Sequence, residues 1–513
     1  MLILTLLRSA AAYAGYLFIF SCLALASYRL LLHPLSKYPG PSLAKLTQAY
    51  AGFYAIKKRL HIEVYQFHKR YGPVVRVGPD RLSFNTVTAL RDIYQNERIT
   101  KASTYLVTTR NNIFNVFSAI DNDLHRQKRQ IVSRAISDRS IQAFEPVLLE
   151  KLDITLKQIL HSSRTSTPAD ITEKSRQLAL DVVGQLAFGY DLHIQTKEDN
   201  RFIMKSMTFG NFRGNVYQHF PLLSKMYIDK IGDKVFYDAR ERYFRLLDKM
   251  ISSRMAQGRD AKNDFYSIAA DSYQDTSRGS ELWIESIFFL VAGGDTTATA
   301  ICGTFFYLSR YPECYRKLAR EIRTTFKNGR DIKTSPQLAS CHYLRACIDE
   351  SMRMSPPIST TLWREQVSGA DTDEPLIVDG HVIPKGILVG VNTYALHHNE
   401  EYFPDPFTYK PERWLEANVN IMAAFAPFST GPRACAGKNL AYLETSLFVA
   451  KALWYFDFES APGKLGEVGG GTPGANNGRS RPNEYQIEDI FTSRHEGPHL
   501  KFTPRGNMCR DLE

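Results

Sequence analysis

The chain contains 513 residues, of which 44% are hydrophobic and 23% charged, a composition that supports a large apolar core and excludes a largely disordered or fibrous protein. Lysine and arginine exceed aspartate and glutamate by 64 to 53, giving a net charge of +11, but no long basic run occurs, so nucleic acid is not expected as a partner. The seven cysteines are scattered without zinc-ligand spacing, which is typical of a protein in a reducing compartment.

The first predicted element is a transmembrane helix at the N-terminus. No charged residue occurs from Ser9 to Tyr28, and leucines continue the apolar character through Leu32, so this stretch is long enough to cross about 30 Å of hydrocarbon. We therefore predict a single-pass membrane anchor over residues 1–32, surrounded by membrane lipid. Because Ala24-Leu25-Ala26 resembles a cleavage site, a cleaved signal peptide is the alternative.

The charges that flank this helix indicate its orientation. Arg8 precedes the apolar stretch, whereas Arg29, His33 and Lys37 follow it. Since basic residues accumulate on the cytoplasmic side of a membrane span, we expect the rest of the chain to face the cytoplasm, with the endoplasmic reticulum as the expected membrane.

A proline-rich segment from Pro34 to Pro41 comes next. Because proline fixes its φ angle and lacks an N–H donor, we predict a stiff linker over residues 33–45 and a globular domain over residues 46–513.

The globular domain is predicted to be mainly α-helical with small β-sheets. Short extended runs from Val74 to Val77 and from Leu82 to Phe84 flank Gly78-Pro79-Asp80, which predicts a β-hairpin. Further extended runs lie from Leu376 to Val378 and from Leu388 to Val391, and most of the remainder has helical periodicity.

One predicted helix, from Ser286 to Ser309, is uncharged except for Asp295. Two adjacent glycines, Gly293 and Gly294, stand directly before Asp295 and Thr296. Each glycine costs a helix about 1 kcal/mol relative to alanine, and a charge among apolar residues costs more unless it has a partner. We therefore expect the glycines to open the helix toward a flat ligand and Thr296 to bond back to a freed carbonyl. A transmembrane or core helix with a kink is the alternative.

Two short segments carry charges. Glu350 and Arg353 lie at i and i+3 on one predicted helix, a spacing that by itself is typical of a surface ion pair. Arg413 follows in the segment Pro411-Glu412-Arg413-Trp414. Neither segment identifies a site on its own.

The segment from Phe428 to Gly437 predicts a tight loop that delivers one thiol, that of Cys435, to the start of a helix. Backbone N–H groups and the helix dipole at such a position favour the thiolate, the form that binds iron. Gly431 lets the backbone approach a flat macrocycle, as does Gly437, and Arg433 can pair with a carboxylate on its rim. A buried structural cysteine in a turn is the alternative interpretation.

A glycine-rich segment from Gly463 to Pro482 also contains proline and asparagine and has no apolar period. It predicts a mobile surface loop, with a disordered insertion as the alternative.

The loop around Cys435 matches every fixed position of the pattern F-x-x-G-x-R-x-C-x-G, so the chain resembles the cytochrome P-450 family, most closely its membrane-bound fungal members. The resemblance runs from about His33 to Arg505. It implies a cytochrome P-450 fold behind an N-terminal transmembrane helix, with a haem-thiolate monooxygenase domain over residues 46–513. It also implies haem as the cofactor, with Cys435 as the axial ligand to the iron. The residues that would contact the haem in this loop are Phe428, Gly431, Arg433 and Gly437.

The same resemblance gives roles to residues elsewhere. The family motif A/G-G-x-D/E-T-T/S is matched around Asp295 and Thr296, which would deliver protons so that the O–O bond of dioxygen breaks. Glu350, Arg353 and Arg413 would form a buried charge network that supports folding and haem retention.

Three more residues are implied in binding the haem propionates. His125 and Arg129 match the family helix W-x-x-x-R in part, since His125 replaces the usual tryptophan, but both side chains can pair with a propionate. Arg364 aligns with another propionate-pairing arginine of the family. Ordinary surface arginines are the alternative for Arg129 and Arg364.

The implied reaction inserts one atom of dioxygen into an organic substrate, with two electrons from NADPH. Because the chain has no dinucleotide-binding glycine loop, a separate NADPH–cytochrome reductase is the expected partner. Basic residues such as Lys128, Arg129 and Lys438 are expected to help it dock.

Three segments are expected to line the substrate pocket, from Ala102 to Ile120, from Phe288 to Ala292 and from Pro357 to Thr361. Their apolar and small hydroxyl side chains suit a hydrophobic small molecule, such as a secondary-metabolite intermediate; ordinary core packing is the alternative. Two other functions stay open: a reductase-independent haem-thiolate isomerase or dehydratase, and a non-catalytic membrane haem-binding protein. The pair Asp295 and Thr296 argues against both.

Overall fold

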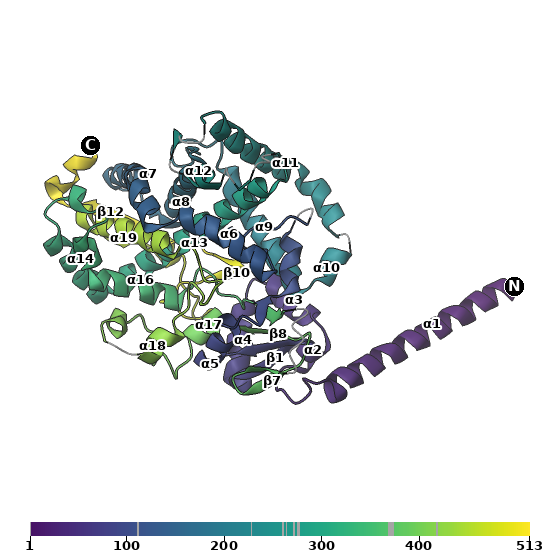
Figure 1. Ribbon diagram of the computed structural model, residues 1–513. Coiled ribbons are helices and arrows are strands. Elements are labelled where there is room, and N and C mark those ends of the chain that lie inside the picture. Colours follow the sequence, from purple (N-terminus) through teal and green to yellow (C-terminus); the bar gives the residue numbers. More distant parts are fainter. Residues whose placement is uncertain are drawn as a thin grey trace.

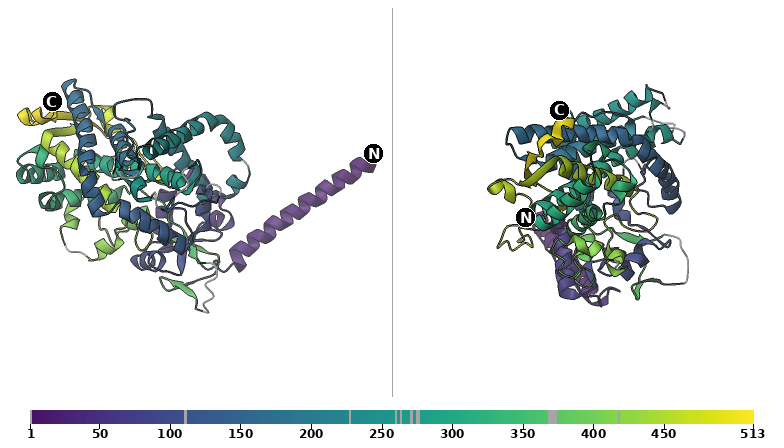
Figure 2. Two further views of the ribbon diagram at one scale, coloured as in Figure 1. Left: turned by 45° about the horizontal axis from the view of Figure 1, so that its top comes forward. Right: turned by 90° about the vertical axis from the view of Figure 1, so that its left-hand side faces the viewer.

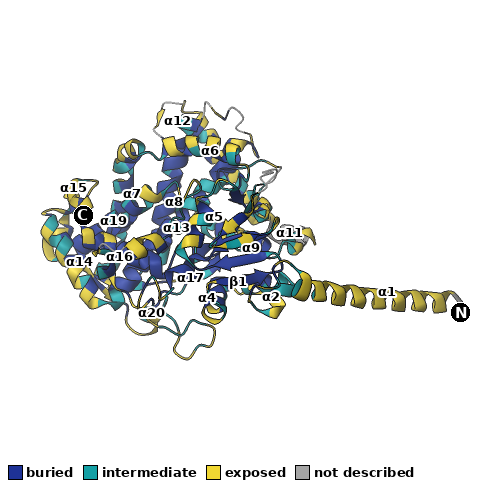
Figure 3. Ribbon diagram, turned by 60° about the horizontal axis from the view of Figure 1, so that its bottom comes forward, coloured by how far each residue is buried: buried dark blue, intermediate teal, exposed yellow. Residues whose placement is uncertain are grey.

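One long helix, α1 (Leu2–Ser27), projects from the body of the protein and continues into a π-helical turn, η1 (Tyr28–Leu32) (Figure 1). This computed structural model describes residues 2–109, 112–226, 228–258, 261–262, 264–269, 272–273, 277–367, 374–416 and 419–513. Nearly all side chains of α1 are exposed (Figure 3). The segment Ile3–Leu32 is long and apolar enough to cross a membrane. The apolar N-terminal helix that the sequence predicts is therefore present.

The segment predicted as a linker, residues 33–45, is packed onto the body. Leu35 is fully buried, and the N–H of Arg76 donates to the carbonyl of Pro39 over 2.8 Å. The Arg76 guanidinium also donates to the carbonyl of Arg29 over 2.8 Å. These contacts fasten the end of the N-terminal helix to the first sheet.

Helices form most of the body (Figure 2). Those around the site described below are α6 (Asn122–Ala135), α8 (Ile171–Phe188), α9 (Phe202–His219), α11 (Ile228–Met255), α13 (Glu281–Arg310), α16 (His342–Met354) and α19 (Lys438–Tyr455). The others are α2 (Ser42–Leu46), α3 (Ala49–Ile56), α4 (Leu60–Tyr71), α5 (Val87–Tyr94), α7 (Asp138–Arg164), α10 (Leu222–Lys225), α12 (Phe265–Ala269), α14 (Pro312–Thr325), α15 (Pro336–Ala339), α17 (Thr393–His397), α18 (Val419–Ala424) and α20 (Lys464–Glu467).

Helix α13 crosses the middle of the body and packs against α8, α16 and α19. The hydroxyl of Ser280 caps it by accepting a hydrogen bond from the N–H of Trp283. Although α13 is also apolar enough to cross a membrane, 61% of its apolar window is buried in the body. The helix expected from Ser286 to Ser309 is thus confirmed as a core helix, and it is longer than predicted.

In the part of the chain that the structure describes, four small sheets complete the fold. The largest has the strand order β1 (Val74–Gly78), β2 (Arg81–Phe84), β8 (Leu388–Val391), β5 (Arg364–Gln366) and β3 (Ile99–Lys101), with β2 and β8 parallel and the other pairs antiparallel. The second has the order β4 (Ala169–Asp170), β12 (His499–Pro504) and β9 (Phe456–Ser460). The pairs β6 (Leu376–Val378) with β7 (His381–Ile383) and β10 (Glu488–Ile490) with β11 (Thr492–Arg494) form the others. The predicted hairpin and the mainly helical fold with small sheets are confirmed.

The glycine-rich segment from Gly463 to Pro482 is a folded loop. The N–H of Gly471 donates to the carbonyl of Arg481, and that of Thr472 donates to the carbonyl of Arg479, each over 2.9 Å. The Arg479 guanidinium donates to the carbonyl of Ile487 over 2.7 Å. Because these bonds close the loop on itself and on the body, the alternative of a disordered insertion is wrong.

Candidate active site

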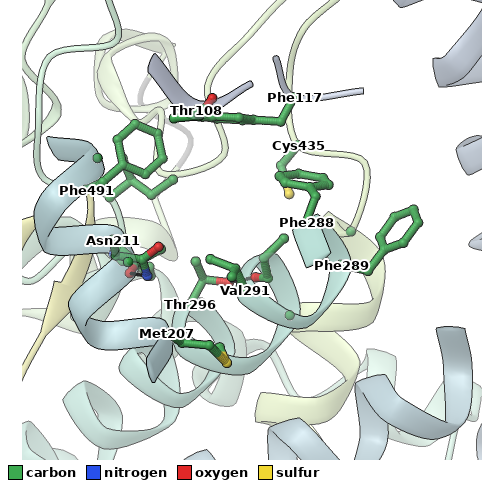
Figure 4. A pocket seen from close by; sticks show the side chains of 18 of the residues that line it. Thr108, Phe117, Met207, Asn211, Phe288, Phe289, Val291, Thr296, Cys435 and Phe491 are labelled. Carbon is green, nitrogen blue, oxygen red and sulfur yellow. Dashed lines mark hydrogen bonds between the residues drawn. The ribbon is translucent and has the colours of Figure 1, made fainter. Parts of the chain in front are cut away.

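A cavity of about 1340 Å³ lies between α13, α9 and the loop before α19. Figure 4 shows its interior, with Phe288 and Cys435 on one side, Asn211 and Phe491 on the other, and Thr296 on the wall formed by α13. Ligand sites for small molecules usually measure about 300–1000 Å³. The cavity is therefore large enough for a planar cofactor and a substrate together.

The loop from Phe428 to Gly437 places Cys435 at the cavity, as the sequence predicts. The N–H of Cys435 donates to the carbonyl of Phe428 over 2.8 Å, which closes the loop. Residue 431 has to be glycine, because its φ is +75° and a Cβ atom there would lie 1.9 Å from the carbonyl oxygen of Tyr94. Helix α19 begins directly after Gly437.

The pKa of the Cys435 thiol differs from what its place at a helix start predicts. Cys435 is accessible from the cavity but lies deep in the body, and burial raises its pKa. The N–H of Gly437 and the charges of Arg129 and Lys438 lower the pKa by less. Burial thus opposes ionisation of the free thiol, whereas a bound metal ion would favour the thiolate, because metal binding displaces the thiol proton.

Five basic side chains gather at the cavity near this loop: Lys101, His125, Arg129, Arg364 and Arg433. Within the described part of the chain none of them forms an ion pair with a carboxylate. Burial and the neighbouring Arg364 lower the pKa of Arg433 to about 10, and burial with four neighbouring cations lowers the pKa of His125 to about 3. A buried basic cluster of this kind fits a ligand with two carboxylates, as haem has in its propionates.

The four predicted propionate-site residues are thus brought together, and each is anchored by the backbone or by burial. Arg129 donates to the carbonyl of Ala434 over 2.5 Å, and Arg364 donates to that of Trp363 over 3.0 Å. Arg433 donates to the carbonyls of Ala119 and Ile120 over 2.5 and 2.8 Å. His125 is buried on α6.

Lys101 is the member of this cluster that the sequence does not indicate. It lies opposite Arg364 in the pairing of β3 with β5. Burial and the charges of Arg364 and Arg433 hold its pKa well below the usual range. The Lys101 ammonium donates to the carbonyl of Phe117, and because like charges opposite each other destabilise a sheet, an anion bound near the pair would be favourable. No local pattern could have found Lys101, because the contact depends on strands far apart in the sequence.

On the other side of the cavity, α13 carries Thr296 and Asp295. The hydroxyl of Thr296 donates to the carbonyl of Ala292 over 2.6 Å, as predicted, and lines the cavity. Asp295 instead points toward α8 and α9, where it forms an ion pair with Arg176 over 3.0 Å and accepts from Asn211 over 3.2 Å. Burial raises the pKa of Asp295, while Arg176 opposes that rise. Of the two predicted catalytic residues, only Thr296 faces the cavity.

The two glycines of α13 serve packing between helices. A Cβ atom on Gly293 would lie 2.8 Å from Val183, and one on Gly294 would lie 2.6 Å from Leu180. Both contacts belong to α8. Both glycines therefore allow α8 to pack closely, and Gly293 also lines the cavity, so the opening of the helix toward a flat ligand stays a prediction.

Glu350, Arg353 and Arg413 form the buried network that the resemblance implies. Arg353 donates two hydrogen bonds of 2.9 Å to Glu350, and Arg413 donates one of 3.0 Å. All three side chains are at most 5% exposed. The indole N–H of Trp414 adds a fourth bond to Glu350 over 3.0 Å. The tryptophan side chain at this position thus contributes a hydrogen bond that an aromatic ring without an N–H group, such as that of phenylalanine, could not form.

The structure changes the expectation for the basic residues near the thiolate loop. Lys128 is buried and forms ion pairs with Glu281 over 2.8 Å and Glu285 over 3.3 Å. Its predicted part in docking a reductase is therefore wrong, because the ammonium group does not reach the surface. Arg129 is half-buried, whereas Lys438 is exposed.

All three segments predicted to line the pocket contribute to the cavity. The first, residues 102–120, supplies Phe117, and its residues 110–111 lie outside the described part of the chain. The other two supply Phe288 and Ile358. Helix α9 adds a wall that includes Met207 and Asn211 and that the sequence does not indicate, because its periodicity does not show which face meets the cavity.

Comparisons with known proteins find relatives along most of the chain. The family model for cytochrome P-450 matches residues 38–467. The chain is 34% identical over 499 residues to cytochrome P-450 monooxygenase AKT7 from Alternaria alternata, which covers 93% of this chain and 94% of that protein. It is 34% identical to cytochrome P-450 monooxygenase poxM from Penicillium oxalicum, over 93% of this chain and 92% of that protein. It is 32% identical to cytochrome P-450 monooxygenase atnE from Emericella nidulans, over 93% of each chain.

Proposed function

Because the chain belongs to the cytochrome P-450 family and is a haem-thiolate monooxygenase, we propose that Cys435 ligates the haem iron and that the substrate is a hydrophobic secondary-metabolite intermediate. One observation carries the residue assignments. The thiol of Cys435 lies at a large cavity together with an unneutralised cluster of basic side chains. The apolar lining of the rest of the cavity supports the substrate class.

Haem, when bound, supplies an iron at which dioxygen is activated for insertion into an organic substrate. The Cys435 thiolate would hold it, and the charges of Lys101, Arg129, Arg364 and Arg433 would neutralise its propionates. His125 would donate a ring N–H to a propionate.

Thr296 and Asp295 would take part in proton transfer to the cavity. The Thr296 hydroxyl donates to Ala292, which leaves its oxygen able to accept a hydrogen bond from a water in the cavity. Asp295 is held by Arg176 and Asn211 on the far side of the helix. We assign to Asp295 the transfer of protons from that side toward Thr296, which would require its carboxylate to leave Arg176.

A Thr296→Ala variant should keep its haem but divert electrons from product to hydrogen peroxide. The expected loss in product formed per NADPH is about ten-fold or more, because proton transfer by a positioned group contributes at least that much. The measurement is NADPH oxidation, product and peroxide, with purified reductase and a turnover substrate from a hydrophobic panel.

Thr304→Ala is the matched control for this prediction. Thr304 makes the same bond, to the carbonyl of Ala300 over 2.8 Å, but does not line the cavity. Its variant should couple NADPH oxidation to product as the wild type does. Normal coupling in Thr296→Ala would remove Thr296 from proton delivery.

We propose that the electrons come from NADPH through a separate reductase. Lys438, exposed beside the thiolate loop, is the basic residue that supports docking there. Turnover without NADPH or reductase would instead support a haem-thiolate isomerase or dehydratase. Haem binding without turnover on any substrate would support a non-catalytic binding protein.

We propose further that α1 anchors the protein in the endoplasmic reticulum with residues 46–513 in the cytoplasm. Deleting residues 2–27 should make the protein extractable from membranes by alkaline carbonate, whereas the full chain should resist extraction. The deletion ends at Ser27 because Arg29 donates to the carbonyl of Leu46 and accepts from Arg76. Extraction of the full chain would contradict the anchor. Protection of residues 46–513 from protease in intact microsomes would contradict the orientation.

A further inference from the structure

Helix α9 presents an asparagine, Asn211, to the cavity on the side opposite Cys435 (Figure 4). Its side chain is half-buried, and the apolar side chains of Met207, one turn earlier on the same helix, and Phe491 flank it on the cavity wall. A polar group in such surroundings discriminates strongly between ligands that can and cannot bond to it.

The orientation of the Asn211 amide is fixed by its partners. Its Nδ2 atom donates to Oδ2 of Asp295 over 3.2 Å and to Oγ1 of Thr492 over 2.7 Å. A carboxylate paired with Arg176 can only accept hydrogen bonds, so the NH2 group has to face Asp295. Both amide hydrogens are thereby used. The carbonyl oxygen, Oδ1, receives no hydrogen bond from any described residue and is left as an acceptor.

A second asparagine, Asn215, repeats this arrangement one helical turn later. Its Nδ2 atom donates to the backbone carbonyl of Asp489 over 3.1 Å and to Oδ1 of the same residue over 3.2 Å. Its own Oδ1 is fully buried and has no hydrogen-bond partner among the described residues. Because this oxygen is buried, a ligand in the cavity cannot reach it, so of the two asparagines Asn211 is the one that can bind a ligand.

Asn115 and Thr296 are two other polar side chains of the cavity whose hydrogen bonds the structure defines. Oδ1 of Asn115 accepts from the N–H groups of Phe117 and Ser118 over 3.1 and 2.8 Å. The Thr296 hydroxyl donates to Ala292. The Asn115 oxygen is therefore occupied and the Thr296 oxygen lies on α13, whereas Asn211 offers an acceptor on the side of the cavity opposite Cys435.

We propose that the substrate is an apolar molecule that carries a hydroxyl group, and that this hydroxyl donates to Oδ1 of Asn211. The assignment rests on the proposed monooxygenase function. Because Asn211 and Cys435 lie on opposite sides of the cavity, the bond holds the hydroxyl away from the thiolate side and presents a distant carbon to it. Asn211 is thus a specificity-determining residue that touches the substrate.

The test compares probes that differ only in the donor. Cyclododecanol donates a hydrogen bond, whereas cyclododecanone of nearly the same size only accepts one. Spectral titration of the haem-loaded full chain should give the alcohol about ten-fold tighter binding than the ketone. Asn211→Leu, similar in size, should bring the two affinities within about two-fold of each other. Equal binding of the two probes by the wild type, failure of both to bind, or an unchanged preference in Asn211→Leu would overturn the proposal.

Met207→Leu is the matched control, because it changes an apolar side chain on the same wall and removes no hydrogen bond. The Met207→Leu variant should bind the alcohol more tightly than the ketone, as the wild type does. Loss of this preference in Met207→Leu would assign the preference to cavity shape and overturn the role of Asn211. The wild-type comparison stands even if Asn211→Leu fails to fold. Each protein is first checked for a thiolate-type carbon monoxide spectrum. Its absence from the wild type would count against the haem-thiolate assignment, whereas a normal spectrum without alcohol preference counts against Asn211 alone.

Discussion

Replacing Glu350 with alanine should lower the free energy of unfolding by about 3–5 kcal/mol and remove most of the bound haem. The Glu350 carboxylate accepts hydrogen bonds from Arg353, Arg413 and Trp414 in a fully buried position. Without it, two buried guanidinium groups would lose the carboxylate that they share. Urea unfolding of the solubilised holoenzyme and haem content per polypeptide measure the effect.

Glu412→Ala is a suitable control for the Glu350 variant, because it removes a neighbouring acid that lies nearer the surface. Glu412 pairs with Lys317, whose side chain is 55% exposed, over 2.5 Å. Such a surface pair contributes about 1 kcal/mol or less. The Glu412 variant should therefore stay close to wild type in stability and haem content. A Glu350 variant within about 1 kcal/mol of wild type would show that the network does not stabilise the fold.

A Cys435→Ser variant should lose the thiolate-type carbon monoxide band completely. The thiolate is the form of cysteine that ligates metal, and a serine hydroxyl does not ionise in its place near pH 7. The variant is measured by difference spectroscopy after reduction, with haem content determined in parallel. No other loop in the described part of the chain was found to present a cysteine to this cavity.

Cys302→Ser provides the control for Cys435→Ser. Cys302 is buried on α13, where its thiol donates to the carbonyl of Ile171 over 3.5 Å, a bond that a serine hydroxyl can also make. This variant should keep the band. Retention of the band by Cys435→Ser would place the iron ligand at another residue.

The parts of the site that follow from local sequence were predictable. Residues close together in the chain determine three of these features: the loop around Cys435 with its flanking glycines, the apolar helix α13, and the hydrogen bond from the Thr296 hydroxyl to the carbonyl one turn earlier. The hairpin β1–β2 likewise follows from two short extended runs about a turn. Periodicity and turn residues carry this information.

The parts that depend on distant segments were not predictable. Lys101 meets Arg364 only because β3 pairs with β5, and Lys128 is neutralised only because α6 packs beside the acidic start of α13. Asp295 turns away from the cavity because Arg176 approaches from α8. These are tertiary contacts, which no single-segment pattern encodes.

The pKa of the Cys435 thiol likewise could not be predicted from sequence alone. Its place at a helix start favours a low pKa, and the neighbouring Gly437 N–H and basic side chains act in that direction. Burial in the body is the larger effect and raises the pKa instead. Sequence indicates the dipole, but only the folded structure shows how far water is excluded.

The most direct test of the Cys435–haem assignment is the reduced carbon monoxide difference spectrum of the wild-type protein, expressed with ample haem. We expect the band typical of thiolate ligation, in an amount that matches the haem bound per polypeptide. A colourless protein, or haem whose carbon monoxide band is that of a histidine ligand alone, would contradict the assignment.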